Sequence, residues 1–246
     1  MSKTTKVAIV VFLVLFLDQA LKIWIKTNMG LGDEINILGQ DWALLHFVEN
    51  PGMAFGWSLD GKYISAETAK IILSVFRIGA VGFLIYLIRS LVKTGAPVGL
   101  LMSFGLILAG ALGNIIDSAF YGLIFEASKF HGGVAMMFPP DGGYAPFLQG
   151  KVVDMFYFPM FKGHFPEWFP AWGGKPYLFF RPVFNLADSA ITVGVFNLII
   201  FHRQFFKAEE EAKKVDENET PRELNDEVSN VIDNATSEEG DIQPQD

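Results

Sequence analysis

The sequence contains no cysteine, so disulfide bonds, thiolate nucleophiles and cysteine metal ligands are excluded. Histidine is scarce as well: the chain has 4, and none stands in the HExxH arrangement typical of zinc peptidases. Chemistry that depends on a thiolate or a zinc ion is therefore not indicated. We expect the protein to work without a metal or another cofactor.

Charged side chains are sparse over most of the chain. They make up 19% of all residues, against 51% hydrophobic residues and a mean hydropathy of +0.32. The net charge of -8 is misleading, because much of it comes from an acidic tail, residues 207–246. This tail has no aromatic residue and no sustained apolar face, so we expect a disordered, solvated segment.

The hydrophobic residues are concentrated in long runs. Four runs approach the length of about 20 residues that an α-helix needs to cross a bilayer. They extend from about Val7 to Ile25, Ile71 to Ile88, Pro97 to Ile116 and Val183 to Phe201. The first run is too long for a signal peptide and no small-residue cleavage site follows it, so we expect it to be retained. Residues 1–206 are therefore predicted to form an all-α membrane protein with four transmembrane helices.

Basic residues predict the orientation of these helices, because Lys and Arg gather in cytoplasmic loops. They occur before the first run, between the second and third, and after the fourth, as Lys3, Lys6, Arg89, Lys93, Arg203 and Lys207. Both termini, and with them the tail, are then cytoplasmic. Residues 27–68 and 118–182 are predicted to be loops on the outer face.

The two outer loops differ in pattern. In the first, Glu34–Gly39 and Trp42–Val48 have the composition of short strands separated by a turn. We expect them to form a small β-rich subdomain on the membrane surface. The second is a long loop rich in Gly, Pro and aromatic residues, which suit the headgroup region of a bilayer.

Five motifs resemble those of the lipoprotein signal peptidases, also called type II signal peptidases. They are Asp18-Gln-Ala-Leu-Lys22, Asn50-Pro-Gly-Met-Ala-Phe-Gly56, Gly110-Ala-Leu-Gly-Asn114-Ile-Ile-Asp117, Lys151-Val-Val-Asp154 and Phe184-Asn-Leu-Ala-Asp188. One such motif would be weak, but all five occur in the order of the family and extend over residues 7–203. The chain is therefore identified as a member of this family.

The resemblance implies a membrane-embedded aspartic endopeptidase that removes the signal peptide from lipid-modified prolipoproteins. Such an enzyme cuts before the diacylglyceryl-cysteine, and its catalytic pair corresponds to Asp154 and Asp188. The implied partners are prolipoprotein substrates and membrane lipids, without nucleic acid, and we expect a monomer. The implied location is the bacterial cytoplasmic (inner) membrane, with the active site at the outer face.

The chemistry of two neighbouring carboxylates agrees with this implication. A carboxylate inside an apolar run, such as Asp188, is costly to place in lipid and needs a functional or structural reason. Desolvation and mutual repulsion raise the pKa of one member of a close pair, so that the pair holds a single proton. The ionised member takes a proton from the attacking water, and the neutral member protonates the carbonyl oxygen and then the leaving amine.

The resemblance also marks residues that bind substrate or support the site: Asn50, Gly52, Asn114, Asn185, Asp18, Lys22 and Asp117. Structural roles are open for most of them. Asn114 and Asn185 either hold the aspartates or satisfy helix ends. Asp18 and Lys22 are one helical turn apart, so we expect them to pair. Asn50 lies in a turn, where Asn is common for backbone reasons, although the resemblance places it beside the substrate.

The chain departs from the family pattern in two ways. Ser118 stands where the family has the Arg of its GNxxDR motif, so Asp117 lacks a neighbouring guanidinium. Arg77, inside the second apolar run, is a candidate replacement, although it could instead pair with Asp18 or extend to the headgroups. The segments 123–150 and 159–182 are longer than the corresponding loop segments in the family.

Two other classes of function stay open at this point. Helices with buried carboxylates also fit a small proton-coupled transporter, which would place charges near the bilayer midplane and broken helices in repeated halves. Here the acids fall near helix ends, and no internal repeat is visible. A non-enzymatic scaffold that docks through its acidic tail is the second alternative.

Overall fold

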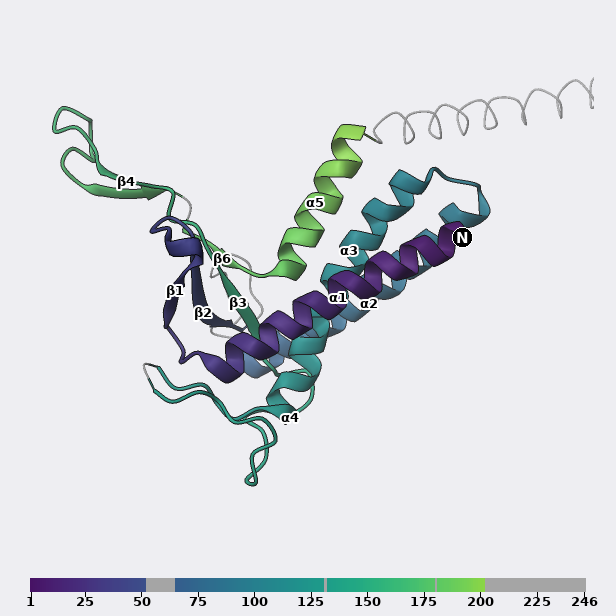
Figure 1. Ribbon diagram of the computed structural model, residues 1–246, viewed down its shortest axis with the longest axis horizontal. Helices are drawn as coiled ribbons and strands as arrows, with labels where there is room; N and C mark the ends of the chain where they lie inside the picture. The colour runs from purple at the N-terminus through teal and green to yellow at the C-terminus, as the bar shows by residue number, and fades with distance from the viewer. Residues whose placement is uncertain (52–64, 131, 180, 202–246) are drawn as a thin grey trace, which may run out of the picture. The chain divides into compact units, whose positions relative to one another are not determined.

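The computed structural model describes residues 1–51, 65–130, 132–179 and 181–201 (Figure 1). The elements are α1 (Lys3–Asn28), β1 (Glu34–Asn36), η1 (Ile37–Gly39), β2 (Leu44–Asn50), α2 (Ala66–Lys93), α3 (Val98–Ile116), η3 (Asp117–Tyr121), α4 (Gly122–Ile124), β3 (Val152–Tyr157), β4 (Phe161–His164), β5 (Pro176–Phe179), β6 (Val183–Phe184) and α5 (Leu186–Phe201). Met1–Asn197 form one compact unit, whose fold is described below. Gly52 and the acidic tail, both subjects of sequence predictions, lie outside the described residues.

Three helical segments in the described part of the chain are long and apolar enough to cross a membrane. They are α1, α2 and the continuous stretch from α3 to α4. The fourth predicted span corresponds to α5, of which 16 residues lie in the described part of the chain, so a fourth membrane-spanning helix is not clearly confirmed. The predicted run began too early: Val183 and Phe184 form strand β6, and Asn185 precedes the first turn of the helix. Short apolar runs do not distinguish strand from helix, which explains the error.

The helix α3 continues beyond its predicted end. The π-helical turn η3 carries the chain into α4, so the helical segment reaches Ile124 and the following loop begins after this residue, later than the predicted residue 118. Asp117, Ser118 and Tyr121 are all buried in or at this turn. π-helical turns are rare in proteins overall, but many of those that occur lie at functional sites.

Small residues allow α3 to pack closely against its neighbours. A Cβ added at Gly110 would lie 2.2 Å from the carbonyl oxygen of Ala187 at the start of α5. A Cβ added at Gly113 would lie 2.6 Å from the carboxylate of Asp18 on α1. Further along α5, Asn197 donates a hydrogen bond to a serine hydroxyl of α3 at 2.7 Å. Close packing and hydrogen bonds of this type hold helices together in lipid, where the hydrophobic effect does not.

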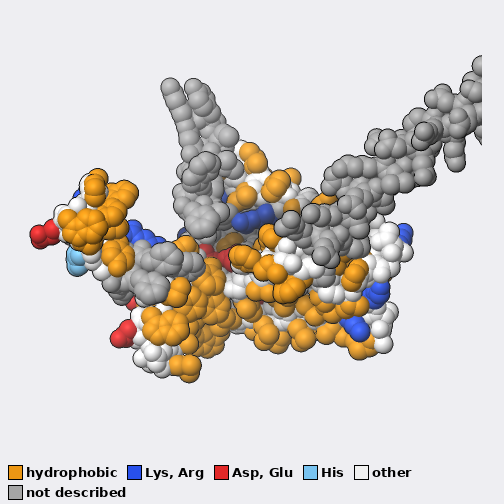
Figure 2. Space-filling model, turned by 90° about the horizontal axis from the view of Figure 1, so that it is seen from above, with side chains coloured by type: hydrophobic (Ala, Val, Ile, Leu, Met, Phe, Trp, Pro, Cys, Tyr) orange, Lys and Arg blue, Asp and Glu red, His pale blue; other side chains and the backbone are white. Residues whose placement is uncertain are grey.

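Large hydrophobic side chains remain exposed on the outside of the helices. They include Phe12, Phe16, Phe76, Phe83 and Phe196. Figure 2 shows hydrophobic side chains over most of the visible face of the described helices. Contiguous apolar surface of this extent is what lipid contact requires. Together with the long apolar helices, it identifies a multi-pass membrane protein.

Segments between the long apolar helices form an antiparallel sheet in the order β1-β2-β3-β6. The two strands predicted in the first loop are confirmed as β1, which begins at the predicted Glu34 but ends at Asn36, and β2, which is shifted along the chain from the predicted bounds. β3 comes from the second predicted loop and β6 from the start of the predicted fourth run, so the sheet joins segments that are far apart in the sequence. In the central pair, Val48 lies opposite Asp154 and Glu49 lies opposite Val153. β4 and β5 form a separate two-stranded sheet.

The main hydrophobic cluster lies where the end of α1 meets the sheet and the η3–α4 segment. Its members are Ile25, Met29, Phe47, Tyr121, Phe125, Val153 and Met155. Successive side chains of a strand point to opposite faces, so β3 buries Val153 and Met155 in this cluster and turns Asp154 to the other face. The core thereby fixes the direction of the first candidate aspartate.

Candidate active site

Asp154 lies in the central strand β3 and is almost fully buried, with 3% of its surface exposed. A buried carboxyl group needs hydrogen-bond partners for its oxygens. Asn50, the last residue of β2, donates from Nδ2 to Oδ2 of Asp154 at 3.0 Å. Asn185 donates from Nδ2 to Oδ1 at 2.7 Å. Both oxygens are therefore held by side-chain amides.

Asp188 lies in the first turn of α5, where the helix dipole favours negative charge. Asn185 stands before this helix, and its Oδ1 accepts from the backbone N–H of Asp188 at 2.9 Å. In return, Oδ2 of Asp188 accepts from the backbone N–H of Asn185 at 3.3 Å. This reciprocal arrangement caps the helix. From α3, Asn114 Nδ2 donates to Oδ1 of Asp188 at 2.9 Å.

Asn185 contacts both aspartates, Asp154 through its side chain and Asp188 through its backbone and side chain. Its Nδ2 also donates to Oδ1 of Asn114 at 3.2 Å. The structure therefore brings the two aspartates of the last two motifs into one site. For Asn114 and Asn185, the geometry favours the predicted role of holding the aspartates, which Asn185 combines with capping α5.

The two aspartates have different surroundings. Burial, followed by the negative charge of Asp188, raises the pKa of Asp154 from 3.8 to about 7, although hydrogen bonds from Asn50 and Asn185 act in the opposite direction. Asp154 therefore keeps a proton up to near-neutral pH. Asp188 accepts N–H hydrogen bonds on both oxygens at a helix N-terminus, an arrangement suited to a carboxylate.

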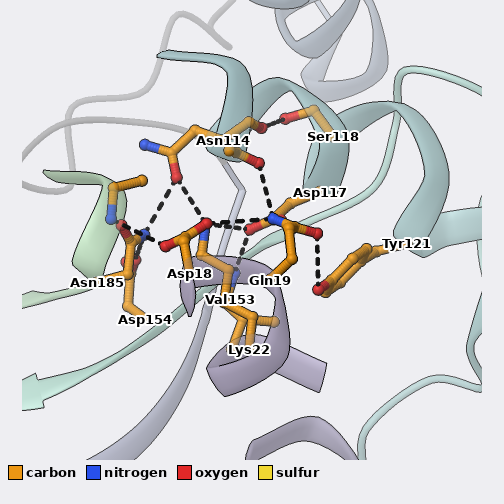
Figure 3. Close-up of polar contacts among 12 residues, drawn as sticks. Asp18, Gln19, Lys22, Asn114, Asp117, Ser118, Tyr121, Val153, Asp154 and Asn185 are labelled. Carbon is orange, nitrogen blue, oxygen red and sulfur yellow. Dashed lines mark hydrogen bonds and ion pairs between the residues drawn. The ribbon is translucent and has the colours of Figure 1, made fainter. Parts of the chain in front are cut away.

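Lys22 links a second group of buried charges next to the aspartates (Figure 3). Its Nζ lies 2.9 Å from Oδ2 of Asp18 and 2.8 Å from Oδ2 of Asp117. It also donates to Oδ1 of Asn114 at 3.0 Å, which connects this group to Asp188. The predicted pairing of Asp18 with Lys22 is confirmed. Removing one member would leave an uncompensated buried charge, which is strongly destabilising.

The two carboxylates that flank Lys22 also bind the backbone of the site. Oδ1 of Asp18 accepts from the backbone N–H of Ala187 at 2.9 Å. Oδ2 of Asp117 accepts from the backbone N–H of Val153 at 3.3 Å. Each of these amides belongs to the residue directly before one of the two candidate aspartates. The Lys22 group therefore holds both chain segments that carry them.

Two residues of this network were not singled out from the sequence. Gln19 donates from Nε2 to Oδ1 of Asp117 at 2.9 Å, and Tyr121 donates its hydroxyl to Oε1 of Gln19 at 3.2 Å. Gln19 lies inside the first motif, and that position was the available signal. Tyr121 depends on the π-turn η3, which the sequence pattern did not indicate.

Among the residues that the structure describes, no group of three or more His, Asp or Glu side chains is arranged to hold a metal ion. The carboxylates of the site are instead contacted by amide and ammonium groups. The site therefore offers the chemistry of two carboxyl groups, and burial raises the pKa of one of them, Asp154, to about 7.

Comparison with known proteins covers the same part of the chain. The family model described as signal peptidase (SPase) II matches residues 10–204. The chain belongs to the signal peptidase II family. The resemblance drawn from the five motifs is thereby confirmed, and the matched residues include all of the described site.

Several members of the signal peptidase II family resemble the chain over most of its length. The lipoprotein signal peptidase of Porphyromonas gingivalis (strain W83) is 49% identical over 195 residues, which are 79% of this chain and 81% of that protein. The lipoprotein signal peptidase of Amoebophilus asiaticus (strain 5a2) is 37% identical over 197 residues, 79% of this chain and 76% of that protein. The one of Chlorobium phaeobacteroides (strain BS1) is 32% identical over 195 residues, 79% and 93% of the two chains.

Two solved structures, both described as bacterial membrane enzymes, resemble the fold. One, determined at 2.3 Å resolution, has a TM-score of 0.52 and 23% identity, covering 80% of this chain and 86% of the other. The second, at 1.9 Å, has a TM-score of 0.50 and 25% identity, covering 80% and 91%. The combination of apolar helices with a small antiparallel sheet therefore recurs in solved membrane enzymes.

Ser118 is the position where this member departs from the signal peptidase II motif. The hypothesis that Arg77 replaces the missing partner of Asp117 is wrong, because Lys22 forms that ion pair. Arg77 instead donates from Nη1 to Oγ of Ser118 at 3.4 Å. Helix α2 therefore brings a guanidinium to the residue that replaces the arginine of the motif.

Proposed function

We propose that the protein is a membrane-embedded aspartic endopeptidase that removes the signal peptide from lipid-modified prolipoproteins. It cuts before the diacylglyceryl-cysteine, and Asp154 and Asp188 are its catalytic pair. Membership of the signal peptidase II family supports the reaction, and the relatives named lipoprotein signal peptidase support the substrate class. The proposal assigns Asn50, Asn114 and Asn185 to holding the pair or the substrate backbone.

The observation that supports the catalytic pair most directly is the position of Asn185. It donates to Oδ1 of Asp154 at 2.7 Å, and its backbone N–H contacts Oδ2 of Asp188 at 3.3 Å. One residue thus holds two carboxyl groups from segments that are far apart in the sequence. Two carboxyl groups with different protonation states in one site are the equipment for acid–base activation of water.

The surroundings of the two aspartates suggest their roles. Asp188 is the ionised member: it takes a proton from water as the water attacks the scissile carbonyl carbon. Asp154, whose pKa is raised to about 7 by burial and by Asp188, is the neutral member. It donates its proton to the carbonyl oxygen as the tetrahedral intermediate forms. Because Asp154 has then given up its one proton, the leaving amine receives the proton taken up by Asp188, not a second proton from the neutral member. Asp154 regains its proton from a hydroxyl group of the intermediate as the carbonyl re-forms and the peptide bond breaks.

The setting of this enzyme follows from the distribution of basic residues. We propose that it lies in the bacterial inner membrane with both termini and the acidic tail in the cytoplasm, and that its catalytic site and sheet lie at the outer face. A site at the membrane surface can receive a substrate whose lipid stays in the bilayer while water reaches the scissile bond. We propose that a single chain suffices and that no nucleic acid is involved.

A proton-coupled transporter, the main alternative from the sequence, is not favoured by these findings. Asp154 lies in a strand of the sheet rather than in an apolar helix. Transport would require charges near the bilayer midplane and helices broken in repeated halves. The family match names a signal peptidase as well.

Purified protein in lipid or detergent tests the function directly. We expect it to cleave a diacylglyceryl-modified prolipoprotein, with mass spectrometry locating the cut before the modified cysteine. The same substrate without the lipid is the control, and we expect little cleavage of it. Absence of cleavage of the modified substrate, or a cut elsewhere, would refute the proposed function.

A further inference from the structure

A second buried polar group lies on the core side of the sheet. It consists of Lys26, Glu49, Ser128, Tyr144 and Lys151, and we name it the Glu49 cluster. The side chains of Lys26 and Glu49 are 0% and 2% exposed and form an ion pair through Nζ and Oε1. Ser128 donates to the same oxygen at 2.7 Å, and Lys151 Nζ lies 3.0 Å from Oε2. Every charge in the cluster therefore has a partner.

The cluster contains two residues of the 123–150 segment, whose role the sequence did not reveal. Lys26 donates to Oγ of Ser128 at 2.8 Å, and its ammonium lies 5.1 Å from the ring centroid of Tyr144. The Tyr144 hydroxyl accepts from the backbone N–H of Lys151 at 2.7 Å. These contacts join the 123–150 segment to the end of α1 and to Lys151, the residue directly before β3.

The same cluster lies at the end of the β2–β3 pair that carries the site. Glu49 is opposite Val153, and the next residue, Asn50, is opposite Val152. Side chains alternate along a strand, so Glu49 points to the core face and Asn50 to the face of Asp154. A slip of the pairing by one residue would turn Asn50 away from Asp154. The Glu49–Lys151 ion pair joins β2 to the residue directly before β3 and opposes such a slip.

Stability alone is a poor explanation for the cluster. A buried ion pair pays for the desolvation of both charges, and apolar residues of the same volume often stabilise a protein as well or better. Burial works to raise the pKa of Glu49, but the Lys26 ammonium and the hydrogen bonds from Lys26, Ser128 and Lys151 outweigh it and hold that pKa below its ordinary value. The carboxylate is thus kept ionised, so the pairing with both lysines persists.

We propose that the Glu49 cluster is a positioning device for the active site, which fastens the 123–150 segment to the sheet and fixes the register that directs Asn50 to Asp154. Glu49 and Lys151 act through Asn50 and do not touch the reacting atoms. The inference rests on the proposed function and assigns to this long segment a part in holding the site.

The pH dependence of kcat/KM distinguishes positioning from a merely structural role. Asp154 faces Asn50, Asn185, Asp188 and Lys22, and the hydrogen bond from Asn50 lowers its pKa. Loss of that bond shifts the alkaline limb of the pH profile upward by about 0.4 to 1 unit, the equivalent of one ordinary hydrogen bond. We expect this shift in Glu49→Gln, with kcat/KM below the limb reduced on the order of tenfold or more.

A second variant and two controls complete the test. Lys151→Met removes the ion pair between Glu49 and Lys151 by changing its partly exposed member. This variant keeps the inference testable if Glu49→Gln fails to fold. Glu126→Gln removes a more exposed carboxylate of the 123–150 segment and should leave the profile unchanged. When Asn50→Ala is already present, adding Glu49→Gln or Lys151→Met should not shift the alkaline limb of the kcat/KM profile any further.

The outcomes separate this inference from the function on which it rests. Folded Glu49→Gln or Lys151→Met protein with a wild-type alkaline limb would refute the positioning role, as would a shift that adds to that of Asn50→Ala. In both cases the wild-type enzyme would still cleave its substrate. Failure of the wild-type enzyme to cleave would instead refute the proposed function itself.

Discussion

At the scale of single residues, the site depends on an asymmetry between two aspartates. Asp154 is buried in a strand and receives two amide hydrogen bonds, whereas Asp188 stands at a helix N-terminus. Burial and the charge of Asp188 raise the pKa of Asp154 to about 7. In the proposed mechanism, this difference between strand and helix end divides the acid and base roles between two identical side chains.

The raised pKa of Asp154 predicts how activity and stability depend on pH. The folded protein binds this proton more tightly than the unfolded chain, so its stabilising effect is complete below about pH 3.8 and is lost as the pH rises through about 7. kcat/KM should fall above about pH 7, because the acid is lost. Thermal unfolding in detergent should show that Asp154→Asn, which cannot ionise, loses less stability than wild type between pH 5 and pH 8.

The pH dependence of activity and the pH dependence of unfolding test different parts of this prediction. An activity that rises steadily through pH 7 would contradict the role of Asp154 as the acid. Equal pH dependence of unfolding in wild type and Asp154→Asn would contradict the raised pKa. Asp141→Asn, at an exposed loop position, is the matched control and should follow wild type in both measurements.

At the scale of secondary structure, the start of α5 decides whether the site forms. Ala187 is close to Gly110 of α3, and its amide is bound by Asp18 of α1. The helix is therefore held on two sides within one residue of Asp188. In the sequence, the apolar Val183 and Phe184 merged with the following run, so the boundary was placed too early. Asn185 as a capping residue was the better boundary signal.

The close packing of α3 against α5 predicts a sharp difference between two glycines. In Gly110→Ala, the new Cβ would lie 2.2 Å from the Ala187 carbonyl oxygen, so α5 must move. We expect a loss of about 1–3 kcal/mol of stability and a lower kcat. Gly82→Ala on α2 meets nothing within 4 Å and should be neutral or slightly stabilising. Unfolding in detergent and turnover of both variants provide the comparison.

This experiment also tests how the second aspartate is positioned. Equal stability and equal turnover of Gly110→Ala and Gly82→Ala would show that the contact between α3 and α5 is not needed to place Asp188. Loss of turnover in Gly110→Ala without loss of folded protein would be the clearest support, because it would locate the defect at the start of α5.

At the scale of the whole molecule, the site exists only because the apolar helices and the four-stranded sheet meet. Lys22 on α1 binds Asp117 at the end of α3, which in turn binds the amide of Val153 in β3. The motifs predicted which residues assemble, since each marks one segment of the site. They could not predict the sheet order or the partner of Asp117, because pairing between distant segments leaves no local pattern in one sequence.

The central claim is that Asp154 and Asp188 together catalyse peptide hydrolysis. The most direct measurement is the turnover of a lipid-modified prolipoprotein by purified Asp154→Asn and Asp188→Asn enzyme, with Asp141→Asn as the control. We predict that each of the first two loses activity on the order of 10²–10⁴-fold or more while remaining folded, because each removes the acid or the base. Near-wild-type turnover by either variant would contradict the catalytic pair.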